Sequence, residues 1–347
     1  MKKLGIGFFL GFLIAGILCM LFDMTSWMGF IVDSLAFGAV FVYGSTGEIL
    51  TEKAGHLNLG VPGIMCMGGA GGCYVINEAV KSGASPMMIV ILGILGALVA
   101  SMLCGLLYSF ITVTLRGNQN VTGLALTIFG VGLSKVIMSL STVSSELYLG
   151  ANDGPKMFFR WPFDQPLTFT QLTRFGVMFF LAIAIAMAAG WVLFRTRVGL
   201  NLRAVGENPA TADAAGINVT RYKYLATCIG SGISGLGGLY YIMDYMQSPE
   251  AYKTIEALGW MSVALVIFAL WRPPLTIVGS AVFGILFSCS DFISHLEWIQ
   301  TNMITKYLLQ MLPYAVTILV LIITSIKGKK ENQPPASLGL SYFREER

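Results

Sequence analysis

Apolar residues are grouped into blocks whose lengths are close to the roughly 20 residues that a helix needs to cross a lipid bilayer. Only 12% of the 347 residues are charged, whereas an ordinary soluble domain is about 25% charged. So few charges could not cover the surface of a soluble protein of this length. The sequence therefore predicts an all-α polytopic membrane protein.

We expect about ten transmembrane helices, some of them broken or re-entrant. The expected spans are 4–22, 28–46, 57–76, 86–115, 121–141, 174–194, 222–246, 257–271, 274–291 and 306–326. Two longer loops separate them, an external loop over 142–173 and a cytoplasmic loop over 195–221. Residues 1–326 then form one transmembrane permease domain, and the charged residues 327–347 form a flexible cytoplasmic tail.

The basic residues orient these spans. If the N-terminus is cytoplasmic, fifteen Lys and Arg residues fall on the inner side and six on the outer side, with Lys135 inside a span. Cytoplasmic loops carry an excess of Lys and Arg, so both termini are predicted to be cytoplasmic. Residues 4–22 lack an A-x-A-like cleavage site, which favours an uncleaved first span over a signal peptide.

Small residues recur at helical spacing in the predicted span 222–246. Gly230, Ser234 and Gly238 follow one another at intervals of four residues and therefore lie on one helix face. Such a stripe predicts close packing against a neighbouring helix in the membrane.

No catalytic or metal-binding pattern is visible in the sequence. His56 and His295 lie in separate predicted loops, and the six cysteines lie in apolar blocks, where they are expected to pack. There is no GxxxxGK[ST] segment, so we expect no ATPase site, metal or cofactor on this chain. Asp33, Lys135 and Asp244 are scattered over three spans, which predicts that an energy source comes from another subunit.

A short polar helix is predicted in the cytoplasmic loop, within GENPATADAAGIN. Asn208 is a favoured N-cap, and Pro209 suits the first helical position. The alanine-rich residues Ala210–Ala215 favour a helix, with Asp213 their only charge, and Gly216 is placed to end it in a left-handed conformation. A helix of about two turns is not stable alone in water, so it either fills a loop or docks in a partner's groove.

A family resemblance adds to this interpretation. RTRVGLNLRAVGENPATADAAGINVTRYKYLA resembles the cytoplasmic loop of ABC-importer permeases of the ribose, simple-sugar and nucleoside class, which are related to branched-chain amino acid permeases. GEILTEKAGHLNLGVPGIMCMGG, LRGNQNVTGLAL, WMSVALVIFALWRP and LLQMLPYAVTILVL match other blocks of that family in the same order. The closest resemblance is to the shorter permease subunit of bacterial nucleoside importers, which often ends in a motif like SLGLSY. It implies a fold like that of type II ABC importers.

The resemblance implies a division of labour among subunits. The loop helix would be the coupling helix, which sits in a cleft of a cytoplasmic ATPase that uses ATP and Mg. The residues to which this role is carried over are Glu207, Asn208, Pro209, Ala210, Asp213 and Gly216. Other implied partners are a second related permease in a heterodimer, an extracytoplasmic substrate-binding lipoprotein and membrane lipid, with no nucleic acid. The chain would import nucleosides across the bacterial cytoplasmic membrane.

Polar residues near two span starts are candidates for the substrate pathway. In TEKAGHLNLGVPGIM, Asn58 lies among glycines and prolines, which predicts either a re-entrant element or a simple loop before a helix. Relatives usually carry glutamate at the position of Pro62, so a structural role is favoured there. Asn120 and Thr122 either line the pathway or cap the next helix.

Charged and aromatic residues inside the spans complete the candidates. Asp33 and Lys135 are costly in lipid and should face the interior or water, where they can pair. Phe41, Tyr43 and Phe129 either stack on a nucleobase or pack in the helix bundle. Two alternatives stay open for the function: a simple-sugar ABC permease, and a secondary transporter coupled to an ion gradient.

Overall fold

The computed structural model describes residues 27–150, 175–294 and 333–343, together with a few residues between 311 and 322. The expected span 4–22 therefore lies outside the described residues. Most of the expected span 306–326 and most of the expected external loop 142–173 also lie outside them. Every regular element in the described part is helical, which confirms the all-α prediction.

Each predicted span within the described residues has a corresponding helix, although the helices that begin at Trp27 and Gln119 extend well beyond the predicted ends of their spans. The helices are α2 (Trp27–Lys53), α3 (Val61–Lys81), α4 (Pro86–Ser109), α5 (Gln119–Gly150), α7 (Val177–Arg195), α8 (Arg197–Glu207), α9 (Pro209–Ala214), α10 (Val219–Tyr240), α11 (Ile255–Phe268) and α12 (Pro273–Ser294). Two π-helical turns, η1 (Phe110–Thr114) and η3 (Tyr241–Met246), extend α4 and α10, and the 3-10 turn η4 (Pro249–Thr254) precedes α11. Within the described residues, six helical segments are long and apolar enough to cross a membrane.

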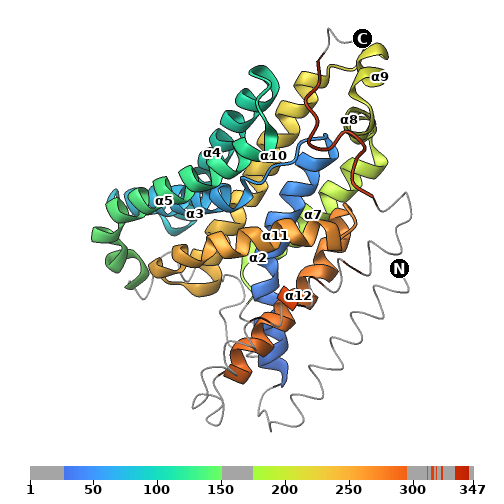
Figure 1. Cartoon of the computed structure of the whole chain (residues 1–347). Helices are drawn as coiled ribbons and strands as arrows, with labels where there is room; N and C mark the ends of the chain where they lie inside the picture. Colours follow the sequence, from blue (N-terminus) through green and yellow to red (C-terminus); the bar gives the residue numbers. More distant parts are fainter. Residues whose placement is uncertain are drawn as a thin grey trace.

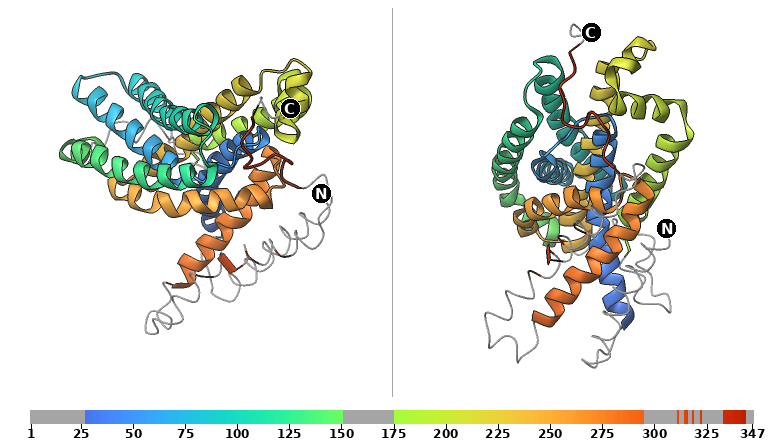
Figure 2. Two further views of the ribbon diagram at one scale, coloured as in Figure 1. Left: turned by 45° about the horizontal axis from the view of Figure 1, so that its top comes forward. Right: turned by 45° about the vertical axis from the view of Figure 1, so that its right-hand side comes forward.

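The helices are arranged around α2 and α10. Figure 1 shows α3, α4 and α5 on one side of α2, α7 on the other side, and α11 crossing α2. Both views in Figure 2 place the short helix α9 and the described C-terminal residues at one end of the molecule and α12 toward the other. The elements of the predicted cytoplasmic loop therefore gather at a single end of the bundle.

The small-residue stripe of α10 brings this helix into contact with α2 and α3, as predicted. A Cβ on Gly238 would overlap the carbonyl oxygen of Met65, and one on Gly230 would overlap the carbonyl oxygen of Gly47. Ser234 lies between them and donates to the carbonyl oxygen of Gly44 over 3.1 Å. This close approach fixes α2, the helix that leads to the buried loop described below.

Candidate functional site

Helix α9, for which a coupling role was predicted, begins as its sequence predicts. Asn208 adopts an extended conformation, and its side-chain oxygen accepts a hydrogen bond from the Thr211 N–H over 3.0 Å. Pro209 is the first residue of α9. One helix here was not predicted: α8 precedes α9, and the Thr196 hydroxyl caps it by accepting from the Gly199 N–H over 3.2 Å.

The end of α9 also has the predicted geometry. Gly216 has φ +82°, and no atom lies within 4 Å of the place where its Cβ would be. The left-handed backbone, and not crowding, therefore favours glycine at this position. The Ile217 N–H donates to the Ala212 carbonyl oxygen over 3.0 Å. Asn218 then caps α10 by accepting from the Arg221 N–H over 2.9 Å.

The two faces of α9 differ in what they contact. Ala212 is buried and packs with Val205 and Val219. The opposite face exposes Ala210 and Ala214. The side chain of each is a single methyl group, so this face of the helix is small and apolar. A flat face of small residues at the end of the molecule is suited to insertion into a groove of another protein.

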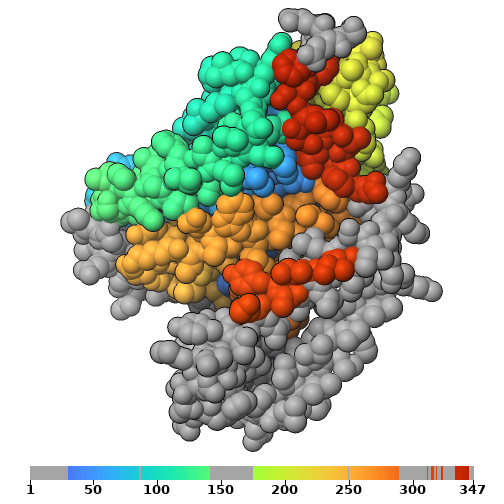
Figure 3. Space-filling view, in the orientation of Figure 1, coloured from blue at the N-terminus to red at the C-terminus, as the bar shows by residue number. Residues whose placement is uncertain are grey.

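The described part of the tail, residues 333–343, is packed, although a flexible tail was predicted over residues 327–347. Residues 335–343, which we call the C-terminal clasp, are packed against the same end of the bundle as α9 (Figure 3). Ser337 is buried, and its N–H donates to the Gly206 carbonyl oxygen over 3.1 Å. The Gly339 N–H donates to the Gly55 carbonyl oxygen over 3.3 Å. The charges and prolines of the tail suggested flexibility, but small residues and backbone hydrogen bonds hold these residues.

Side chains extend the contacts of the clasp to α9 and α5. Tyr342 donates its hydroxyl hydrogen to Asp213 over 2.9 Å, and the Ala336 N–H donates to the Glu207 carboxylate over 3.3 Å. The Gln119 amide donates to the Leu340 carbonyl oxygen over 3.2 Å. Thus Glu207 and Asp213, both predicted to serve the coupling helix, hold it to the clasp.

A buried polar cluster lies beneath this end, and the sequence analysis missed it. Glu48 and Glu52 lie one turn apart in the last two turns of α2, with only 1% and 3% of their surfaces exposed. Glu48 accepts from the Asn58 N–H over 3.0 Å, and Glu52 accepts from the Trp271 indole N–H. The predicted span ended at residue 46, so both glutamates were assigned to a loop. Their spacing of four residues was the available signal.

The segment between α2 and α3 is buried in protein over most of its length. Asn58 is 1% exposed, and its side-chain oxygen accepts from the Gly60 N–H over 2.9 Å. Gln119, also missed, accepts from the Leu57 N–H over 2.8 Å, and Tyr108 donates to the Leu57 carbonyl oxygen over 2.7 Å. Irregular backbone is therefore satisfied by side chains from α4 and α5. Both Asn58 and Gln119 act here as structural partners of this loop.

His56 lies in this loop and faces α10. Its Nδ1 is 2.9 Å from the hydroxyl oxygen of Thr227, and its ring packs against Tyr108 with 5.9 Å between centroids. Burial, helped by the positive charge of Lys223, lowers the pKa of His56 well below its usual range. The ring is therefore neutral at neutral pH.

We expect acidification to destabilise the chain through His56. Because its pKa is lower in the folded state than the unfolded value of about 6.5, stability is present above that pH and is lost as the pH falls below it. Between neutral and mildly acidic pH, the melting temperature of the purified chain should fall more steeply than the melting temperature of the His56→Gln variant. Equal pH dependence of the two melting temperatures would contradict this expectation. Both chains contain Glu48 and Glu52, so the contribution of these glutamates to the pH dependence cancels in the comparison.

The structure does not bring the eight predicted pathway residues to one cavity. Phe41 and Tyr43 are fully buried, and Tyr43 donates to the Met178 carbonyl oxygen over 2.7 Å. Phe129 is 52% exposed, and Asn120 is also exposed. Their pathway role stays a prediction.

The remaining candidates have local partners. Thr122 donates to the Asn118 carbonyl oxygen over 2.7 Å, one helical turn away. Lys135 lines a cavity of about 230 Å³ together with Glu256, and Asp33 is not among the lining residues. The predicted pairing of Asp33 with Lys135 is therefore not a feature of this cavity.

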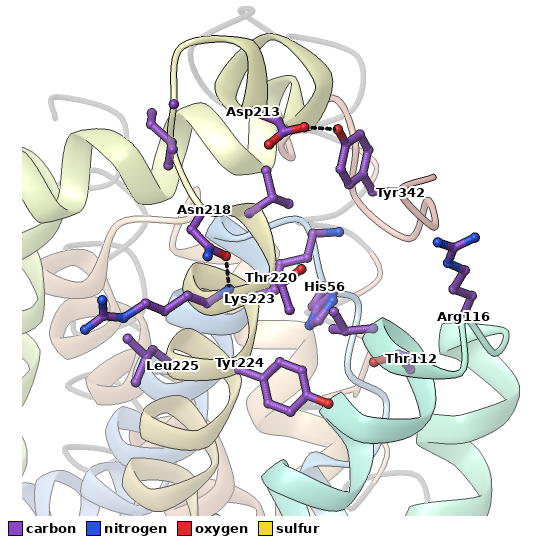
Figure 4. Close-up of a pocket in the computed structure, with 15 residues that line it drawn as sticks. His56, Thr112, Arg116, Asp213, Asn218, Thr220, Lys223, Tyr224, Leu225 and Tyr342 are labelled. Carbon is purple, nitrogen blue, oxygen red and sulfur yellow. Dashed lines mark hydrogen bonds between the residues drawn. The ribbon is translucent and has the colours of Figure 1, made fainter. Parts of the chain in front are cut away.

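A cavity at this end of the bundle lies beside α9. It measures about 740 Å³ and is bordered by η1, the end of α9, the start of α10, His56 and Tyr342 (Figure 4). Helix α9, the clasp and the cavity form one continuous region, which is the candidate functional site.

The described residues therefore define a multi-pass helical membrane protein with a short capped helix at one end of its bundle. The chain belongs to the family of permease components of branched-chain amino acid transport systems, whose model matches residues 30–321.

Three relatives show the range of this family. The chain is 32% identical over 299 residues to NupC, a nucleoside ABC transporter permease of Lactococcus lactis, covering 84% of this chain and 90% of the relative. It is 27% identical over 335 residues to NupQ, a guanosine ABC transporter permease of Bacillus subtilis, covering 94% and 100%. It is 32% identical over 251 residues to TsgC13 of Haloferax volcanii, named as a glucose ABC transporter permease, covering 71% and 72%.

Proposed function

We propose that this chain is the membrane permease of an ATP-driven importer that carries nucleosides into the cell. The observation that carries the proposal is the similarity to NupC and NupQ, which extends over most of the length of all three proteins. NupQ matches over 335 residues, whereas the protein named as a glucose permease matches over 251.

The subunit supplies the passage, and a cytoplasmic ABC ATPase supplies the energy. The exposed face of α9, with Ala210 and Ala214, docks in a groove of the ATPase. Asn208 and Gly216 fix where this helix starts and stops, and Glu207 and Asp213 tie it to the clasp. ATP and Mg are bound and used by the partner. Movement of α9 on ATP binding then opens the passage to one side at a time.

The other partners follow from the same proposal. A second, related permease completes a heterodimer, and an extracytoplasmic lipoprotein delivers the substrate. Both termini of the chain lie on the cytoplasmic side of a bacterial cell membrane, in agreement with the fifteen basic residues on that side.

A simple-sugar permease is the second candidate, supported by the 32% identity to TsgC13. Uptake of labelled nucleosides by the complex reconstituted in vesicles decides between them, with ribose and glucose as competitors. We expect unlabelled nucleosides to compete and sugars not to compete. Competition by sugars alone would overturn the nucleoside assignment.

The same vesicles test the ion-coupled alternative. Uptake should continue after an ionophore collapses the ion gradients and should stop when the ATPase carries an inactivating substitution in its nucleotide site. The opposite pattern would show a secondary transporter.

A further inference from the structure

The cavity beside α9 is lined by both apolar side chains and a group of polar and basic ones. Thr112 and Arg116 come from η1 and the residues after it, and Asn218, Thr220 and Lys223 come from the start of α10. Figure 4 shows Arg116 and Tyr342 across the cavity from Asn218 and Lys223. A space of about 740 Å³ is large enough for a ligand of many atoms.

Lys223 is the most unusual group of this lining. It is only 3% exposed, and no hydrogen bond or ion pair to its ammonium group occurs within the described part of the chain. A buried charge is costly unless it is paired and hydrogen-bonded. The lysine lines a cavity, so a ligand that enters it can supply the missing partner.

The nearby carboxylates are engaged elsewhere. Asp213 is the only acidic residue in the cavity lining and accepts the hydrogen bond of Tyr342 over 2.9 Å. Glu48 and Glu52 bind the Asn58 N–H and the Trp271 indole N–H. The lining has an excess of positive charge because it holds Arg116, Arg221 and Lys223 against its one acidic residue.

The remaining donors suit an anion with several oxygens. Arg116 and Arg221 stand at the exposed edge of the cavity, and guanidinium groups bind phosphate oxygens with two parallel hydrogen bonds. The Thr220 hydroxyl lies in the same lining and adds a neutral donor, whereas the Thr112 hydroxyl donates to the Tyr108 carbonyl oxygen over 2.8 Å. The neutral ring of His56 adds no negative charge that would repel an anion.

We propose that this cavity binds a phosphate group, with Lys223 as its buried anchor and Arg116 and Arg221 at its rim. The phosphate can belong to an anionic phospholipid, because the cavity lies just after the end of α4 and at the start of α10, two of the membrane-spanning helices, or it can belong to a small phosphorylated metabolite. In either case the occupied site joins the coupling helix to η1 and α10. This proposal does not depend on which substrate the permease carries.

Binding is measured on the purified full-length chain in detergent. The probes are phosphatidylglycerol with phosphatidylcholine as the neutral-headgroup comparison, followed by native mass spectrometry, and AMP or inorganic phosphate, followed by calorimetry. We expect phosphatidylglycerol or one of the soluble phosphates to bind. We also expect Lys223→Met to weaken that binding about tenfold or more, the effect of one charge-assisted hydrogen bond. Lys253→Met removes an exposed lysine of η4 and should leave binding unchanged.

The arms identify the source and can overturn the proposal. Preference for phosphatidylglycerol over phosphatidylcholine assigns a lipid headgroup, and binding of AMP or phosphate assigns a soluble ligand. No binding of any phosphate probe, or equal affinity of the Lys223→Met chain, would overturn the site. If that variant does not fold, Arg116→Gln at the exposed rim replaces it, and unchanged affinity then has the same meaning. Nucleoside uptake is scored separately in vesicles, so failure of the substrate assignment does not affect this result.

Discussion

Replacing Ala214 by tryptophan should reduce ATP-driven transport by the reconstituted complex to background. Ala214 lies on the exposed face of α9, so the chain itself has room for the larger side chain. A groove of the ATPase that is shaped for a face of small residues has no room for the tryptophan side chain. We expect affinity for the ATPase to fall at least about tenfold, which corresponds to about 1.4 kcal/mol. Co-purification of the ATPase and substrate uptake in vesicles measure the two effects.

Two matched variants separate docking from folding. Ala214→Ser keeps the face small and should keep both ATPase binding and transport. Ala212→Trp places the same bulk on the buried face, and it should lower the yield of folded chain. Normal transport by the Ala214→Trp complex would remove α9 from the ATPase interface.

Ending the chain after Gln333 should uncouple the permease from its ATPase. This truncation removes the C-terminal clasp, and with it the backbone hydrogen bonds from Ser337 to Gly206 and from Gly339 to Gly55. Each such bond contributes about 1 kcal/mol, and the exposed loop backbone loses partners that it cannot replace within the protein. We expect a lower melting temperature and fewer substrate molecules moved per ATP hydrolysed, measured in detergent and in vesicles.

Two further variants serve as controls for the truncation. A chain that ends after Phe343 keeps the whole clasp and should behave as the full-length chain. Tyr342→Phe removes only the hydrogen bond to Asp213. Its melting temperature and its coupling should lie between those of the chain that ends after Gln333 and those of the chain that ends after Phe343. Full coupling by the chain that ends after Gln333 would show that the clasp has no part in transmission.

Local signals were sufficient to predict the ends of helix α9. Asn208 and Gly216 act through their own backbone neighbours, so capping rules place the ends of α9 from the sequence alone. The positions of most membrane helices were predicted for a similar reason, since apolar length is a property of one segment.

Long-range contacts were not predictable in this way. The extent of α2 beyond residue 46 depends on the partners of Glu48 and Glu52, which come from the next loop and from Trp271. Because the residues after 46 include polar ones, hydropathy alone predicts that the span ends there. The faces of Phe41 and Phe129 were equally undetermined, because an apolar helix in a membrane is apolar on its buried and lipid-facing sides alike.

The clasp also constrains the order in which this protein can be assembled. Ser337 binds Gly206 across 131 residues of chain, and at about 5–20 residues per second a ribosome needs on the order of ten seconds to synthesise that stretch. During this time α8 and α9 have left the ribosome without the segment that later holds them. A nascent permease therefore enters the membrane before the end of the bundle that carries α9 is complete, and an ATPase that recognises the held form of α9 would leave such unfinished chains unengaged.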